Sequence, residues 1–239
     1  MVDICPLMIE NRILLEDNHL IVVNKLPGEI VQGDKTGDIP LSESVKDYLK
    51  RKYNKPGNVF TGVVHRLDRP VSGIVVFAKT SKALARMNEL FQKKEFEKIY
   101  WAVTGVKPRQ SEGTLEGYLS KNEAKNKSYV EKDGSKGGKH SVLHYKLLGA
   151  SDNYFLLEIN PVTGRHHQIR ALLAWAGMPI KGDLKYGFNR SNKDGSIHLH
   201  AHEVRFIHPV KNEPVHLVCP PPDEPLWNFF AGQTHENKN

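Results

Sequence analysis

Cysteine is scarce in this sequence, with only Cys5 and Cys219 among 239 residues. The two cysteines lie far apart and lack the close spacing that metal sites use, which favours a reducing compartment over a disulfide framework. No apolar run approaches the length of a membrane span, and the first residues lack a basic segment followed by an apolar core. We therefore expect a cytoplasmic protein that does not enter a membrane.

Two widespread catalytic motifs are also missing. The sequence has no G-x-x-x-x-G-K-[ST] loop and no G-x-S-x-G turn, so nucleotide triphosphate hydrolysis and serine hydrolase chemistry lack their usual residues. The glycine-rich stretch 134–138 does not open a helix, which excludes it as a phosphate-binding loop.

Positive charge, in contrast, is abundant. The formal net charge of +7 and the pI near 9.2 favour a polyanionic partner, because phosphates release counterions when they bind Lys and Arg. Six lysines gather between residues 121 and 139. That stretch is either a solvated loop or a loop that contacts phosphates. Nucleic acid is the favoured partner, and composition does not separate RNA from DNA.

The hydrophobic pattern predicts an α+β fold in a single domain, residues 1–239, with a core from about 13 to 219. We expect a mixed, largely antiparallel central sheet flanked by helices and loops. Apolar residues at helical spacing indicate helices at about 41–52, 81–94 and 166–176, and a helical turn at 226–230. Strands are expected at about 13–16, 20–24, 74–78, 96–105, 113–120, 128–132, 140–148, 154–160, 197–207 and 215–218. Turn residues between 133 and 138 predict a hairpin there.

One stretch, 65–80, places a carboxylate between two arginines directly before a strand that is apolar on both faces. Leu67-Asp68-Arg69-Pro70 is typical of a tight turn, because proline fixes its own φ and restricts the residue before it. Loops held by a rigid strand are common places for catalytic residues. Taken alone, Asp68 is better explained as a solvated ion pair or a turn-capping carboxylate.

A second stretch, 161–170, is dense in hydrogen-bond donors where a strand passes into a helix. Helix N-termini attract anions through their free amides and dipole. Arg165 lies in this first turn and is placed to meet a phosphate or a carboxylate such as Asp68. The alternative is a capped helix with surface basic residues.

A third pattern supports a rival hypothesis. His198, His200 and His202 alternate on a predicted strand, and imidazole is a common zinc ligand, so a metal-dependent hydrolase is conceivable. Only Glu203 supplies a nearby carboxylate. We therefore favour a half-buried strand with histidines on its wet face, and we expect no metal.

Five stretches in order resemble the catalytic domain of RNA pseudouridine synthases of the RluA type. His65-Arg66-Leu67-Asp68-Arg69 with Ser72-Gly73 is similar to the catalytic signature of that family. The other four stretches are 16–25, 97–102, 163–187 with its Thr-Gly-Arg-His-His-Gln-Ile-Arg run, and 199–209. The resemblance covers nearly the whole chain.

The resemblance implies an enzyme that converts uridine in structured tRNA or rRNA to pseudouridine, by breaking the N1–C1′ bond and rejoining the flipped base through C5. Asp68 would be the catalytic carboxylate and Arg165 the cation that pairs with it. Tyr100 would pack against the base, and Leu199 would line the pocket. Attack of Asp68 on the sugar, attack on the ring and removal of a sugar proton all stay open. The reaction needs no cofactor and no metal.

Further residues follow from the same resemblance. Arg66 and Arg69 would hold the displaced backbone or fill the space left by the flipped nucleotide. Contacts with the RNA backbone are expected from His65, Lys98, His167, Arg170, Lys125, Lys127, Lys136 and Lys139. Pro70-Val71 and His166 depart from the usual family residues, which would alter the turn and a substrate contact.

The resemblance starts near residue 13, so we expect a stand-alone catalytic domain without the S4-type RNA-binding domain that many relatives carry. RNA is the expected partner, with no obligatory protein partner, and a monomer is the default. The alternative from another class is a catalytically inactive RNA-binding protein of the same fold.

Overall fold

The structure, a computed structural model, describes residues 8–34, 36–134 and 137–236. It confirms the predicted α+β class. The chain divides into two compact units, which we call unit 1 (Met1–Glu97 and His202–Pro220) and unit 2 (Lys98–Ala201 and Pro221–Asn239). The expected single domain stays a prediction. No helix in the described part of the chain has both the length and the apolar character needed to cross a bilayer.

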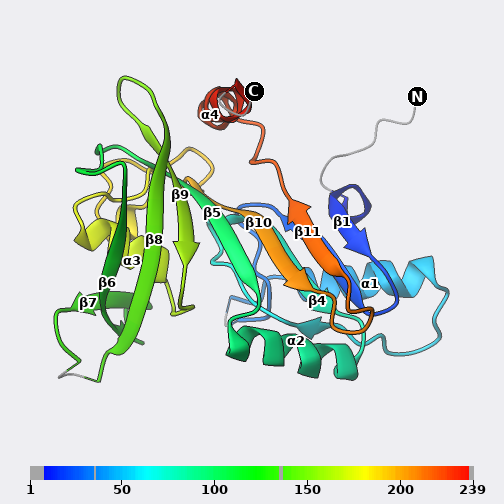
Figure 1. The fold of residues 1–239 in the computed structure, drawn as a ribbon. Coiled ribbons are helices and arrows are strands. Elements are labelled where there is room, and N and C mark those ends of the chain that lie inside the picture. The colour runs from blue at the N-terminus through cyan, green and yellow to red at the C-terminus, as the bar shows by residue number, and fades with distance from the viewer. Residues whose placement is uncertain (1–7, 35, 135–136, 237–239) are drawn as a thin grey trace. The chain divides into compact units, whose positions relative to one another are not determined.

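Unit 1 is built on antiparallel strands that carry two helices. Strand β2 lies between β1 and β4, the short β3 also pairs with β4, and β10 lies between β4 and β11 (Figure 1). Strand β10 (Leu199–Ile207) starts in unit 2 and continues into unit 1. The other elements are η1 (Ile9–Arg12), β1 (Ile13–Glu16), β2 (Leu20–Lys25), α1 (Leu41–Lys52), β3 (Gly62–Val63), β4 (Ser72–Ala78), α2 (Ser81–Lys93) and β11 (Pro214–Val218).

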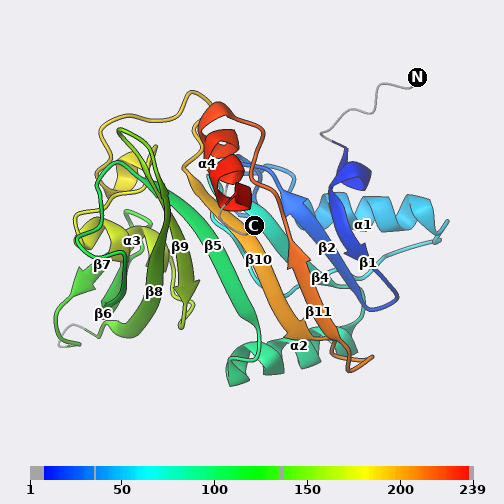
Figure 2. The same ribbon diagram turned by 45° about the horizontal axis from the view of Figure 1, so that its top comes forward.

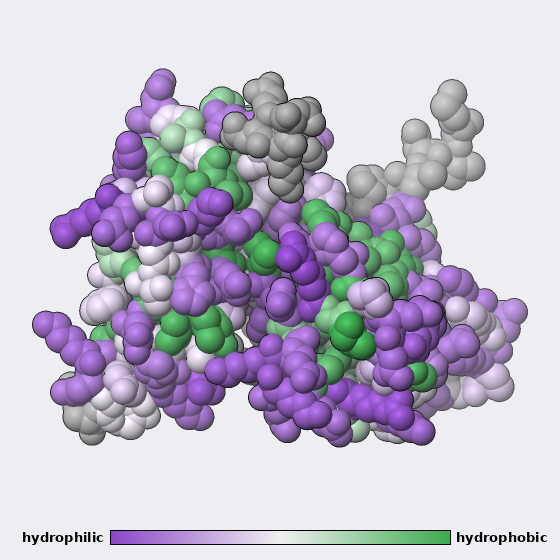
Figure 3. Space-filling view, viewed as in Figure 1, coloured by the Kyte–Doolittle hydropathy of each residue, from purple (hydrophilic) through white to green (hydrophobic). Residues whose placement is uncertain are grey.

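The core of unit 1 forms where α2 packs on the sheet. Every residue of β4 is buried, as its unbroken apolar run predicts. Ile74 and Val76 of β4 share one hydrophobic cluster with Ala83 and Met87 of α2. Thr80 caps the N-terminus of α2, since its side chain accepts a hydrogen bond from the Ala83 amide, and the outward face of the helix is hydrophilic (Figure 3). A rigid strand therefore follows directly after the Asp68 turn.

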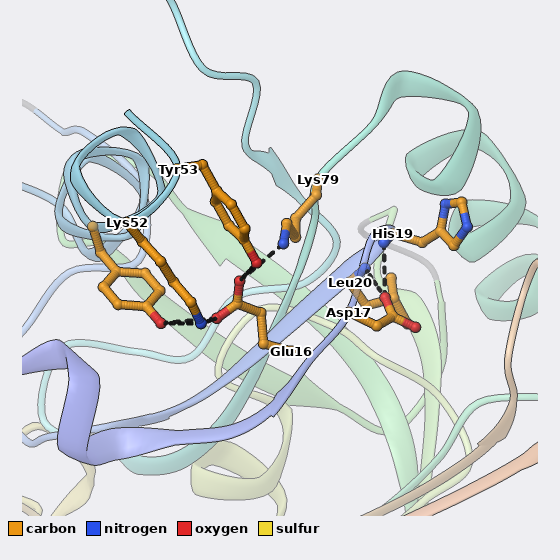
Figure 4. A network of polar contacts seen from close by, with 8 residues as sticks. Glu16, Asp17, His19, Leu20, Lys52, Tyr53 and Lys79 are labelled. Atoms are coloured by element: carbon orange, nitrogen blue, oxygen red, sulfur yellow. Dashed lines mark hydrogen bonds and ion pairs between the residues drawn. The ribbon is translucent and has the colours of Figure 1, made fainter. Parts of the chain in front are cut away.

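A polar network lies at the C-terminal end of β4. The carboxylate of Glu16 accepts hydrogen bonds from Lys52, Lys79 and Tyr53, at 2.7, 3.0 and 2.7 Å (Figure 4). Tyr48 donates a fourth bond at 2.8 Å. Although burial opposes ionisation, these bonds hold the pKa of Glu16 at about 2. One carboxylate thus ties β1 to α1 and to the residue after β4.

Unit 2 is built on a sheet of antiparallel strands in the order β5-β9-β8-β6-β7 (Figure 2). Helix α3 packs on β6 and β7 through Ala171 and Leu119, and α4 packs through Trp227 and Phe230 on β5 and β9. The elements are β5 (Glu97–Thr104), β6 (Glu112–Asn122), β7 (Lys127–Glu131), β8 (Lys139–Ala150), β9 (Phe155–Pro161), α3 (Gln168–Trp175), η2 (Leu184–Tyr186) and α4 (Pro225–Glu236).

The hairpin predicted at 133–138 is wrong. Strands β7 and β8 both pair with β6, on its two sides, so the hairpin joins β6 to β7 instead. Its turn holds Asn126 at φ 44°, a left-handed conformation that asparagine tolerates. Gly134 and Gly138 approach Tyr118, and a Cβ on Gly138 would lie 3.0 Å from the tyrosine Cβ. Gly137 instead has a φ of 77°, and its amide donates to the Gly134 carbonyl oxygen at 3.0 Å, so a turn is present although β7 and β8 do not pair with each other.

Candidate active site

Asp68 lies in the turn that leads into β4. The Val71 amide donates to the Asp68 carbonyl oxygen at 3.0 Å, which closes a four-residue turn over Arg69 and Pro70. Leu67 and Val71 are buried, whereas Asp68 is half-buried. The predicted turn is confirmed, and it presents a carboxylate at the start of a strand whose residues are all buried.

The side chain of Lys25 fixes the backbone of this turn through hydrogen bonds. Its ammonium donates to the carbonyl oxygens of Val71, Leu26 and Arg69, at 2.5, 2.9 and 3.1 Å, and the side chain is fully buried at the end of β2. Burial lowers the pKa of Lys25 to about 7, against the opposing charges of Glu29 and Asp68. A buried cation therefore lies within electrostatic reach of the Asp68 carboxylate.

The basic residues beside Asp68 differ in their exposure and in their side-chain contacts. Arg66 is exposed. Arg69 is also exposed, but its guanidinium forms an ion pair with Asp38 and donates to Thr36 Oγ1 at 2.9 Å. His65 Nε2 accepts the Val76 amide at 3.2 Å, and its ring lies 5.7 Å from Phe91 and from Phe96. His65 is therefore packed into unit 1, and its contact with RNA stays a prediction.

The remaining expected site residues belong to unit 2. Tyr100 lies on β5 opposite Ile159 and is 9% exposed, and Leu199 begins β10 and is 4% exposed. Lys98 precedes Tyr100 on the same side of β5, and burial lowers its pKa. Its ammonium lies 3.7 Å from the place that a Cβ on Gly164 would take. The structure thus brings Lys98 to the segment that carries Arg165.

Arg165 lies in a loop, residues 163–168, which we call the Arg165 loop. Its backbone amide donates to Gln168 Oε1 at 3.1 Å, and the Gln168 amide donates to the Arg165 carbonyl oxygen at 3.1 Å. The Arg165 side chain is exposed, with one long bond from Nε to the His140 carbonyl oxygen at 3.4 Å. The backbone of Arg165 is therefore fixed, while its guanidinium points to the surface.

His167 adopts a left-handed conformation, φ 54°, just before α3. This conformation is costly for a non-glycine residue and needs support from its surroundings. The support comes from the Tyr186 hydroxyl, 2.9 Å from His167 Nδ1, and from the His166 ring, stacked at 3.8 Å. The Ser128 hydroxyl of β7 donates to the His166 carbonyl oxygen at 2.8 Å, and the Nδ1 of the His166 ring lies 2.9 Å from the same hydroxyl.

Arg170 is placed differently from the prediction of an RNA contact. Its guanidinium forms two hydrogen bonds with Asp183, at 2.7 and 2.9 Å, and both side chains are buried. The Tyr186 ring lies 5.1 Å from the same guanidinium. The RNA contact of Arg170 stays untested, and this buried ion pair argues for a structural role instead.

Of the expected lysine contacts, Lys125 and Lys127 lie on the β6–β7 hairpin, and Lys139 begins β8. Lys125 and Lys139 are exposed, and the Lys127 ammonium lies 4.9 Å from the Tyr186 ring centre. Lys136 lies outside the described residues. Lys127 directly precedes Ser128, so the hairpin is joined to the Arg165 loop through the Ser128–His166 bonds.

A sequence model of the family described as RNA pseudouridylate synthase matches residues 19–175. The chain belongs to this family. It is 32% identical over 222 residues to the ribosomal large subunit pseudouridine synthase C of Buchnera aphidicola subsp. Baizongia pistaciae, covering 90% of this chain and 68% of that protein. The namesake in Vibrio vulnificus is 31% identical, with 89% and 66% covered. The chain thus spans about two thirds of the length of these relatives.

The fold agrees with this assignment. A solved structure of human RNA pseudouridylate synthase domain containing 4 superposes with a TM-score of 0.76, at 24% identity, covering 95% of this chain and 94% of that one. The predicted family and the predicted enzyme class, an isomerase acting on RNA, are confirmed by the family match and the named relatives.

For two of the three histidines of the metal hypothesis, the expected position on the wet face of a strand is wrong, whereas His202 is half-buried. His198 and His200 are buried, and His198 precedes the first residue of β10. The His198 ring lies 3.0 Å from Asn192 Nδ2 and from Glu224 Oε2, and burial lowers its pKa to about 4. Among residues 8–34, 36–134 and 137–236, no group of three or more His, Cys, Asp or Glu is arranged to hold a metal ion. In this pseudouridylate synthase, the His198 ring instead contacts Glu224 and Trp227 at the start of α4.

Sequence reasoning missed two residues that support the site, Lys25 and Gln168. The sequence did contain a signal for Lys25. This lysine ends an apolar strand just before a Pro-Gly turn, and a lysine in such a position is noteworthy because lysines are rarely buried. Gln168 gave no comparable signal, because a polar residue at the start of a helix is common on the surface.

Proposed function

We propose that this chain isomerises uridine in RNA of the large ribosomal subunit, with Asp68 as the catalytic carboxylate. The observation that carries the substrate is the match over about nine tenths of the chain to two relatives named as ribosomal large subunit pseudouridine synthases. The position of Asp68 within a signature that resembles that of the family, on a turn fixed by Lys25, supports the catalytic role.

The proposed reaction moves one glycosidic bond. The N1–C1′ bond breaks, the flipped uracil rotates, a C5–C1′ bond forms, the proton on C5 is lost to solvent and N1 gains a proton. No oxidant and no added group is required. A uridine inside a stacked RNA cannot reach a half-buried carboxylate, so the nucleotide must leave the stack first.

Residues of unit 2 are proposed to bind the uridine. Arg165 supplies an exposed guanidinium on a backbone that is fixed by Gln168, which suits the preorganised cation that such a reaction needs. Tyr100 and Leu199 are proposed to contact the base through largely buried side chains. These roles rest on their positions in motifs that resemble those of the family.

The RNA backbone is proposed to meet basic side chains of both units. Arg66 is the better candidate in unit 1, because the Arg69 guanidinium is already paired with Asp38. Lys125, Lys127 and Lys139 are the candidates around the β6–β7 hairpin. Such contacts would fix register on the RNA without reading sequence.

We further propose that the enzyme works as a monomer, without an obligatory protein partner, in the cytoplasm. The high positive charge supports direct binding of RNA by this chain. Light scattering of the purified protein and cell fractionation would test these two statements.

The substrate is tested by tritium release from C5-labelled uridine. Transcripts of large-subunit ribosomal RNA and a pool of tRNA are incubated separately with the purified chain. We expect release from the ribosomal transcript. Release from tRNA alone would overturn the ribosomal substrate, and release from neither would contradict the proposed activity.

A further inference from the structure

The Arg165 loop is closed on itself and on β8 by side chains of the loop. The Thr163 hydroxyl accepts the Val142 amide at 2.9 Å and donates to Gln168 Oε1 at 2.7 Å. The same Oε1 accepts the Arg165 amide at 3.1 Å. Gln168 Nε2 donates to the Val142 carbonyl oxygen at 3.0 Å. The carboxamide of Gln168 therefore joins three parts of the chain at one point.

The oxygen and the nitrogen of the Gln168 carboxamide each bond in the only role that the atom can take. A glutamine oxygen accepts and its nitrogen donates, so the carboxamide is fixed in one orientation by two donors on one side and a carbonyl on the other. Gln168 is 4% exposed. A buried carboxamide that is bonded through both its oxygen and its nitrogen holds its neighbours rigidly, and losing it would leave several groups unpaired.

The result is a fixed backbone under a surface guanidinium. The Arg165 side chain is exposed, and its Nε donates a long bond to the His140 carbonyl oxygen at 3.4 Å, so the fixed backbone largely sets the position of the guanidinium. Lys98 is half-buried and its ammonium lies against Gly164, so a shift of the loop would also change the surroundings of this lysine.

We infer that Gln168 is a positioning residue for Arg165, acting through the Arg165 amide and through Thr163. The inference rests on the proposed role of Arg165 in the reaction. Gln168 does not touch the RNA in this account. It determines the position of the Arg165 guanidinium. A displacement of about 1 Å of a catalytic group can lower the rate by about 100-fold.

The test is a double-mutant cycle on kcat and KM for tritium release, using Gln168→Met, Arg165→Met and the double variant. We expect Gln168→Met to lower kcat by about 10-fold to 100-fold, with KM within about 3-fold of wild type. In the Arg165→Met background the same change should lower kcat by less than about 2-fold, because the group being positioned is gone.

A matched control separates positioning from loss of fold. Leu173→Val removes one methylene from the fully buried face of the same helix without touching the loop, and its kcat should stay within about 2-fold of wild type. Hydrogen exchange gives a readout that is independent of activity. The Arg165 amide should exchange at least about 10-fold faster in Gln168→Met than in Leu173→Val.

Two results would overturn the inference, and they are distinguishable. If Gln168→Met lowers kcat equally in both backgrounds, or not at all, Gln168 does not act through Arg165 and the proposed function stands. If Arg165→Met itself keeps wild-type turnover, the inference falls together with the proposed role of Arg165.

Discussion

The ammonium of Lys25 lies 2.5 Å from the carbonyl oxygen of Val71, the residue that ends the turn begun by Asp68. The same ammonium contacts the Arg69 carbonyl oxygen, so a buried cation fastens two of the four residues of this turn. Burying a lysine is costly unless its donors are satisfied, and here three carbonyl oxygens satisfy them. This buried lysine lies at the turn that presents the proposed catalytic carboxylate.

Lys25→Met should therefore loosen the Asp68 turn. The Val71 carbonyl oxygen loses its donor, whereas the Arg69 carbonyl oxygen keeps the Gly28 amide at 2.8 Å. We expect a loss of about 1–3 kcal/mol in the free energy of unfolding and a fall in kcat of about 10-fold. Urea unfolding and tritium release from the same preparation measure the two effects.

Lys79→Met is the matched control for that variant. Lys79 is a buried lysine of the same unit, beyond the other end of β4, paired with Glu16. The Lys79→Met variant should lose a comparable amount of free energy of unfolding, and its kcat should equal that of the wild-type enzyme. An equal loss of kcat in both variants would show that Lys25 acts only through general stability.

The Glu16 network predicts a loss of stability in acid. The folded pKa of about 2 lies below the ordinary value of 4.5, so the stabilisation is present above pH 4.5 and is lost as the pH falls toward 2. The shift corresponds to an upper bound of about 3 kcal/mol at pH 7. Glu16→Gln should remove this contribution, and its free energy of unfolding should vary less steeply between pH 4.5 and 2.5.

An exposed ion pair provides the comparison. Glu43 pairs with Lys46 one helical turn away, and both side chains are substantially exposed. Glu43→Gln should change the free energy of unfolding by less than about 0.5 kcal/mol at pH 7. A Glu16→Gln variant as stable as Glu43→Gln at pH 7 would contradict the role given to the network.

Chelation tests the rival metal hypothesis. We expect tritium release to be unchanged after treatment with a chelator and gel filtration, because Asn192 and Glu224 contact the His198 ring and Trp227 stacks on it. Activity that falls on chelation and returns with added zinc would restore His198, His200 and His202 as metal ligands.

Local patterns were sufficient to predict much of the fold and the Asp68 turn. Strand β4 was predictable because an unbroken apolar run bounded by turn residues has few other interpretations, and Pro70 marked the turn before it. Helix α2 was predictable from Leu84, Met87, Leu90 and Phe91 at helical spacing.

Features that depend on tertiary contacts were not predictable. The glycines near 134–138 resemble a hairpin turn in sequence, but β7 and β8 both pair with β6, and Gly134 and Gly138 approach Tyr118 of β6. His198 and His200 looked like surface residues, because polar side chains on an alternating strand are usually exposed, and their burial depends on α4 packing from residues far along the chain. Gln168 and Lys25 act through bonds to segments distant in sequence, which no local pattern encodes.

The most direct test of the central claim is the tritium release of Asp68→Asn, measured with RNA binding on the same preparation. Asparagine keeps the shape of the side chain and removes the negative charge and the carboxylate chemistry. We expect no detectable turnover above background, with RNA affinity within about 3-fold of wild type. Substantial turnover by Asp68→Asn would contradict the claim that Asp68 is the catalytic carboxylate.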